Sequence, residues 1–141
     1  MKITKVEQQG LRLTLRLARS PDQQNLGELA DAEDLSEALV AKILGKLRRG
    51  GIVQALRGRK GGYVLSASTN DVSVADIIQA MNQPILEGCY NTQPRQRGDQ
   101  CPHHSECGLR PIWSYLEEQI TRVLKQITLA DLLHTENEVS A

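Results

Sequence analysis

The sequence predicts a mainly α-helical fold with one small β-hairpin and a long helix near the C-terminus. Hydrophobic residues make up 40% of the 141 residues, but there is no Phe and only one Trp, so Leu, Ile, Val and Ala must build the core. Such a composition favours helices. Polar residues typical of helix starts precede several periodic apolar runs, and a glycine-rich basic turn separates two short β-type runs. The length is about that of one domain.

The first helix is expected around "LRLTLRLA", residues 11–18. Its four leucines alternate with other residues, which by period alone indicates a strand. The same leucines also form i, i+4 pairs, and Leu and Arg are good helix formers, so we predict a helix. Ser20 and Pro21 should end it, because the residue before a proline disfavours helical geometry.

Repeated start signals indicate two further helices. In "NLGE" Asn25 precedes Glu28 by three positions, and "DLSE" repeats this spacing with Asp34 and Glu37, so both resemble capping boxes. After the second signal, apolar residues recur every four positions until a Gly-Gly pair at 50–51 stops the helix. These residues are Leu35, Leu39, Ile43 and Leu47, with Ala38 on the same face.

The stretch "IVQALRGRKGGYVL" predicts a hairpin with strands at 52–56 and 63–65. The turn between them holds three glycines and three cations, and glycine permits the backbone angles that tight turns need. Helix, turn, helix and basic hairpin together are typical of a winged helix-turn-helix. The predicted fold class is therefore mainly α with a small β-hairpin wing, plus a long C-terminal dimerisation helix.

The net charge of zero conceals an asymmetry between the two halves. Residues 1–70 carry twelve Lys and Arg against seven Asp and Glu, and residues 71–141 carry five against ten. The basic first half, combined with the winged-helix pattern, favours double-stranded DNA as partner. We predict that DNA is contacted by Ser36, Glu37, Val40, Ala41 and Lys42 on the recognition helix, Arg48 and Arg49 at its end, and Arg57, Arg59 and Lys60 on the wing.

Three more helices are expected in the second half. Ser73 and Asp76 resemble the cap of a helix that residues 82–84 close. A helix of about 18 residues should start near Leu109, and a short helix over residues 127–133 should follow, capped by Thr128. The tail to residue 141 is expected to fray.

The long helix carries an apolar stripe that exceeds what the small N-terminal core needs for cover. A second copy of the chain is the expected partner, and a homodimer would match two DNA half-sites related by a twofold axis. An intramolecular packing role is the alternative. The predicted dimer residues are Ile112, Trp113, Leu116, Ile120, Val123 and Leu124.

All three cysteines lie in residues 87–111, "EGCYNTQPRQRGDQCPHHSECGLRP". No apolar run is long enough for a membrane span and the N-terminus lacks the apolar region of a secretory signal, so we expect a cytoplasmic protein. In a reducing compartment three clustered thiols indicate metal binding or redox chemistry. Cys107 stands just ahead of the long helix, whose dipole favours a thiolate. No enzyme is expected, because neither a CxxC motif nor a supported Ser/His/Asp set is present.

The chain resembles the winged-helix iron-sulfur transcription regulator family that includes IscR, NsrR and RirA. The resemblance covers essentially the whole chain and is carried by "MKITK", "VQALRGRKGGYVL", "VSVADIIQAM", Cys89-x11-Cys101-x5-Cys107 and "QITLADLL". It implies a dimeric DNA-binding transcription factor whose long helices cross. It also implies an iron-sulfur cluster, [2Fe-2S] or [4Fe-4S], held by Cys89, Cys101 and Cys107 near the dimer interface.

The fourth ligand departs from the family pattern. IscR-like members have a His three residues after the last cysteine, where this chain has Arg110. NsrR-like members use a carboxylate near the N-terminus of the partner subunit, where this chain has Gln8 beside Glu7. Glu7 is therefore one candidate, and His103 and His104 are others.

Several alternatives remain open at this stage. Zinc could take the three cysteines and a histidine, or two cysteines could form a regulatory disulfide. A protein-interaction scaffold built on the winged helix is a third possibility. In each case we expect one compact domain with a winged-helix region at 1–70, a helix and sensor loop at 71–108, and the dimerisation helix and tail at 109–141.

Overall fold

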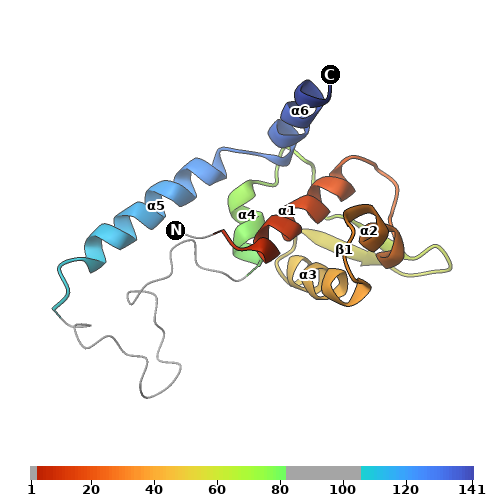
Figure 1. The fold of residues 1–141 in the computed structure, drawn as a ribbon, viewed down its shortest axis with the longest axis horizontal. Coiled ribbons are helices and arrows are strands. Elements are labelled where there is room, and N and C mark those ends of the chain that lie inside the picture. Colours follow the sequence, from red (N-terminus) through yellow and green to blue (C-terminus); the bar gives the residue numbers. More distant parts are fainter. Residues whose placement is uncertain (1–2, 82–105) are drawn as a thin grey trace, which may run out of the picture.

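The computed structural model describes residues 3–81 and 106–141. Within these ranges it contains α1 (Lys5–Ala18), α2 (Leu26–Glu33), α3 (Glu37–Arg49), β1 (Val53–Leu56), β2 (Gly62–Leu65), α4 (Val74–Ala80), α5 (Arg110–Lys125) and α6 (Leu129–Ser140). Helices α1 to α4 and the hairpin gather around one core, while α5 extends away from it as an arm (Figure 1). The predicted fold class is confirmed.

Helix α1 confirms the helical interpretation of the leucine-rich stretch. Leu13, Leu15 and Leu17 are buried in the core, and the helix ends at Ala18, ahead of Pro21. Alternating leucines are compatible with a helix here because α2, α3, α4 and α6 all pack around α1. A helix with neighbours on several sides buries more than a single narrow stripe.

The helix-turn-helix is formed by α2 and α3, and one predicted cap is wrong. Asn25 and Glu28 do form the expected capping box at the start of α2. Asp34, however, ends α2 in a left-handed conformation with φ 52°, and Ser36 caps α3 by accepting a bond from the Leu39 N–H at 3.2 Å. Aspartate tolerates the left-handed region that the tight turn requires.

The wing is an antiparallel hairpin in which Val53 pairs with Leu65 and Leu56 with Gly62. Its base is extended by an unpredicted bridge, because Gln24 and Tyr63 exchange two backbone hydrogen bonds of 2.8 and 3.2 Å. A Cβ on Gly62 would lie only 2.7 Å from the Gln24 carbonyl oxygen. Glycine at this position therefore allows the segment before α2 to anchor the wing.

The C-terminal elements meet at a joint that links them to the start of α4. Ser73 and Thr128 cap α4 and α6 respectively, and the two residues form an antiparallel bridge. The cap and the first residues of α4 are as predicted. Residues 82–84, which were predicted to end this helix, lie outside the described residues. The expected fraying of the tail is wrong, since α6 continues to Ser140. Leu132 and Leu133 pack against the core, and Glu136 pairs with arginines of α1.

The core consists of apolar side chains, mostly aliphatic, from β1 and from every helix except α5, and Tyr63 and Leu65 of β2 pack against it partly buried. Among the residues that the model describes, no helix is both long and apolar enough to span a membrane.

Candidate functional site

The outer face of α3 displays most of the side chains predicted to read DNA. Ser36, Glu37, Ala41 and Lys42 are exposed. The prediction that Val40 contacts DNA is wrong, because its side chain is completely buried. Ala38 was expected on the buried face and is exposed instead. The buried surface of α3 is made by Val40, Ile43, Leu44 and Leu47, which form two rows because α3 packs against α1, α2, α4 and β1.

The basic residues around α3 are also on the surface. Arg48 and Arg49 in its last turn are exposed, as are Arg57, Arg59 and Lys60 in the loop that joins β1 to β2. This loop projects from the body beyond the strands (Figure 1). Gly58 within it has φ 131°, an angle that other residues rarely adopt. Five cationic side chains are thus exposed on α3 and on the neighbouring wing loop, where a polyanion can reach them.

The C-terminal end of α4 contacts α3 closely. A Cβ built on Gly50 would lie 2.4 Å from the Ala80 Cβ, and Lys46 donates a 3.4 Å hydrogen bond to the Met81 carbonyl. On its other side Met81 packs against Gly10 of α1, where a Cβ would lie 2.9 Å from the sulfur. The last described residue before the cysteine-bearing part of the chain is therefore held between α1 and the recognition helix.

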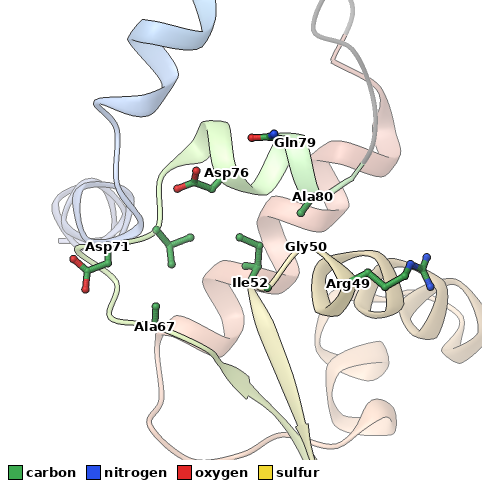
Figure 2. A pocket seen from close by; sticks show the side chains of 10 residues that line it. Arg49, Gly50, Ile52, Ala67, Asp71, Asp76, Gln79 and Ala80 are labelled. Carbon is green, nitrogen blue, oxygen red and sulfur yellow. The ribbon is translucent and has the colours of Figure 1, made fainter. Parts of the chain in front are cut away.

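Beside this contact lies a hollow of about 530 Å³ between the end of α3, the start of β1 and α4 (Figure 2). Its apolar lining includes Ile52 and Ala80, and its polar lining includes Asp71, Asp76 and Gln79. The Arg49 guanidinium points away from the hollow, so this cation remains on the outer surface.

Of the predicted metal ligands, Cys107 is described and Cys89, Cys101, His103 and His104 lie outside the described residues. The Cys107 side chain is half-exposed, and its carbonyl accepts from the Arg110 N–H in the first turn of α5. The residue at the N-cap position of α5 is Leu109, which makes no side-chain capping bond, and the second helical residue is Pro111. A helix N-terminus beside a half-exposed thiol suits a thiolate ligand. Donor type and placement at Cys107 therefore fit iron or zinc.

Glu7, the candidate fourth ligand, is buried near the start of α1. Its carboxylate accepts a hydrogen bond from the Thr4 backbone N–H, which satisfies one orphan donor at the helix start. To bind a metal, the carboxylate would use its other lone pairs or release Thr4. The role of Glu7 as a ligand stays a prediction.

The apolar stripe of α5 divides into two parts. Ile120 and Leu124 are half-buried, on a helix that packs along α4. Ile112, Trp113, Leu116 and Val123 remain 38–57% exposed, and no residue of α5 is fully buried. The exposed apolar part is the surface that the sequence assigns to a second copy.

Contacts between segments that lie far apart in the sequence were not predicted. The bridge from Gln24 to Tyr63, the close approach of Gly50 to Ala80 and the bond from Lys46 to Met81 have no signature in local periodicity. The single available hint is glycine itself at positions 10, 50 and 62, since a glycine within or beside a regular element indicates close backbone approach.

Comparison with known proteins places this architecture in a family. The model of the Rrf2 family, described as "Iron-dependent Transcriptional regulator", matches residues 3–135. The HTH-type transcriptional regulator IscR of Pectobacterium carotovorum is 29% identical over 110 residues, which cover 77% of this chain and 63% of that protein. The chain thus spans a little under two thirds of the length of this curated relative.

Two solved structures share the fold over nearly the whole chain. The IscR of T. potens is 26% identical and superposes with a TM-score of 0.74, covering 100% of this chain and 92% of that one. CymR of B. subtilis, the "Global Cysteine Regulator", is 27% identical with a TM-score of 0.69 and coverages of 94% and 95%. With its winged helix and long arm helix, the chain belongs to the Rrf2 family of transcriptional regulators.

Proposed function

We propose that the protein is a homodimeric regulator that binds double-stranded DNA and whose DNA affinity depends on an iron-sulfur cluster. The observation that carries DNA binding is the combination of an exposed recognition helix, α3, and an exposed basic wing next to it. In this arrangement Ser36, Glu37, Ala41 and Lys42 contact base edges in the major groove. The wing and the end of α3 supply phosphate contacts.

The half-exposed stripe on α5 supports a homodimer as the binding unit. An exposed apolar surface of this extent on an arm helix is costly in water unless a partner covers it. A second copy would place two recognition helices for two half-sites of one duplex. The dimer residues would be Ile112, Trp113, Leu116 and Val123, with Ile120 and Leu124 shared between α4 and the interface.

The cluster ligands would be Cys89, Cys101 and Cys107, with Glu7 of the second copy as candidate fourth ligand. When bound, such a cluster ties thiolates from separate parts of the chain together and responds to oxidants and iron supply. The contacts of Met81 support a route from these cysteines to DNA. A displacement of Met81 would reach α3 through its hydrogen bond with Lys46, and one of Ala80 through its contact with Gly50.

A thiol-disulfide switch without a cluster is the second candidate. The likeness to CymR favours it, since that neighbour is described as a regulator of cysteine. Absorption and Mössbauer spectra of anaerobically purified protein discriminate between the two, because only the cluster gives iron signals.

The DNA-binding part is tested through the wing. Replacing Arg59 and Lys60 together by Ala removes two phosphate contacts, so the slope of log affinity against log salt should fall by about two. Fluorescence anisotropy with a random-sequence duplex measures this slope.

The matched control replaces Arg122 and Lys125 by Ala, two exposed cations that lie on α5 and not on α3 or the wing. This control should leave the slope unchanged. An unaltered slope in the wing variant would disprove phosphate contact by the wing. Absence of binding by the wild-type protein, even at low salt, would favour the scaffold alternative.

A further inference from the structure

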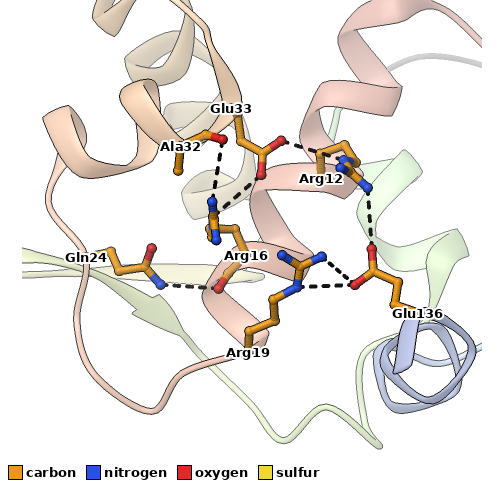
Figure 3. A network of polar contacts seen from close by, with 7 residues as sticks. All are labelled: Arg12, Arg16, Arg19, Gln24, Ala32, Glu33 and Glu136. Atoms are coloured by element: carbon orange, nitrogen blue, oxygen red, sulfur yellow. Dashed lines mark hydrogen bonds and ion pairs between the residues drawn. The ribbon is translucent and has the colours of Figure 1, made fainter. Parts of the chain in front are cut away.

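A chain of five charged side chains connects α2, α1 and α6 (Figure 3). The signs alternate along it: Arg16 and Arg12 both approach Glu33 at 3.6 Å, and Arg12 and Arg19 both approach Glu136, at 3.4 and 2.6 Å. Glu136 is the only acid of α6 in this chain of contacts among the described residues. It is the point at which the C-terminal helix is fastened electrostatically to the winged-helix core.

Geometry makes the Glu136 contact stronger than an ordinary surface pair. Arg19 donates from both Nε and Nη2 to the same carboxylate oxygen, at 3.2 and 2.6 Å. The side chains of Glu136 and Arg19 are 26% and 42% exposed, so solvent screens the contact in part. Charge-assisted forked hydrogen bonds of this type are stronger than single neutral ones. An apolar seat made by Leu129, Leu132 and Leu133 completes the docking of α6.

The beginning of α6 is tied to the start of α4 by the backbone. The Val74 N–H donates to the Ile127 carbonyl and the Leu129 N–H to the Val72 carbonyl, each at 2.9 Å, and the Ala130 N–H donates to the Thr69 carbonyl at 3.1 Å. Only residues 126–128 separate α5 from α6. We call these paired segments, residues 126–130 and 69–74, the joint. Because the joint follows α5 directly, it holds the C-terminal end of α5 in place.

The rest of α5 is held less deeply than the joint. Helix α5 packs along α4, yet none of its side chains is fully buried. A 16-residue helix is about 24 Å long, so a small rotation at its C-terminal end displaces its N-terminal end by several ångströms. The stiffness of the joint, together with the packing along α4, thus bears on where α5 points.

We propose that α6 is a latch that sets the direction of α5, with Glu136 as its key residue, and thereby sets the separation of the two recognition helices in the dimer. This inference rests on the proposed dimeric DNA binding. When α6 is held by Glu136, the distance between the two recognition helices varies little, and the dimer selects one half-site spacing. An unfastened latch lets α5 vary in angle, and the dimer then accepts several spacings.

The test compares Glu136→Gln with Glu138→Gln, a matched control. Glu138 lies two residues further on the same helix, is exposed, and pairs only with His134 among the contacts described. Hydrogen exchange followed by mass spectrometry is measured for the wild type and both variants. Amides at the joint, residues 72–74 and 127–130, should exchange roughly five- to tenfold faster in Glu136→Gln, and at the wild-type rate in the control.

The functional readout is tolerance of half-site spacing. Duplexes selected by the wild type from a random pool are altered by one inserted or deleted base pair between the halves, a shift of about 3.4 Å along the axis. The wild type and Glu138→Gln should lose roughly tenfold in affinity, and Glu136→Gln should lose markedly less.

Each outcome bears on the proposal separately from the proposed function. Unchanged joint exchange in Glu136→Gln overturns the latch. Faster exchange with unchanged spacing tolerance overturns the link between the latch and DNA geometry. A wild type that selects no duplex overturns the proposed function and the spacing link, and the exchange measurement still decides whether Glu136 fastens the joint.

Discussion

At the scale of single residues, glycines determine how closely the helices approach one another. Gly50 is in an ordinary helical conformation, so its role is steric rather than conformational. The space that a side chain would need is occupied by Ala80. Gly45, five residues earlier in α3, has only the flexible end of Arg49 nearby, at 3.8 Å.

These two glycines give a paired prediction. Gly50→Ala should lower the free energy of unfolding by about 1–3 kcal/mol, because the new methyl group forces α3 and α4 apart. Gly45→Ala should raise it by about 0.5–1 kcal/mol, since alanine loses less entropy in a helix. Urea denaturation of both variants measures the two effects. Equal changes of one sign would contradict the packing of α4 against α3.

At the scale of elements, α6 depends on its first turn. The Asp131 carboxylate accepts a hydrogen bond from the Thr128 backbone N–H at 2.8 Å and another from the Thr128 hydroxyl at 2.9 Å. These bonds, the backbone one above all, lower the pKa of Asp131, and the nearby His134 lowers it slightly further. A depressed pKa means that the ionised form is bound more tightly in the folded state.

The pH dependence follows from that direction. Stabilisation by Asp131 is complete above the pKa of an unfolded aspartate and is lost as the pH falls through the lower pKa of the folded state. We expect Asp131→Asn to speed amide exchange in the first turn of α6 at neutral pH and to remove this acid dependence. Glu138→Gln is the control. An Asp131→Asn protein with the wild-type acid profile would show that the cap does not contribute.

Helix α5 gives a second prediction at this scale. Leu116→Glu puts a charge in the exposed apolar stripe and should weaken dimerisation by roughly a hundredfold or more, because an unpaired charge would be buried. Ser114→Glu, on an exposed polar position two residues earlier, should leave dimerisation unchanged. Sedimentation equilibrium compares the two. A Leu116→Glu dimer as stable as the wild type would rule out this surface as the interface.

At the scale of the whole molecule, local signals explain which parts were predictable from sequence. Capping boxes at Asn25 and Ser73 and the periodic leucines of α1 act within one or two turns, so the presence and order of the helices were predicted correctly. Val40 was misplaced because four elements surround α3, which buries a wider surface than one row. The burial of Val40 is set by its tertiary environment, which local periodicity does not report.

The length of α6 was missed for a related reason. Its second half, "HTENEVS", has little apolar periodicity and by itself predicts a frayed tail. Contacts of Glu136 with Arg12 and Arg19, more than a hundred residues away in sequence, stabilise it as a helix. Long-range ion pairs of this kind have no local sequence signature, and the latch therefore became visible only in the folded chain.

The two halves of the molecule are coupled in the proposed function, in which the DNA affinity of the winged helix depends on what the three cysteines bind. The most direct test measures the affinity of one duplex, selected by the protein, before and after anaerobic reconstitution with iron and sulfide. We predict affinities that differ by about 5- to 150-fold, the usual range for coupled sites, and a difference that Cys101→Ala abolishes. Equal affinities for protein with and without the cluster would contradict the account.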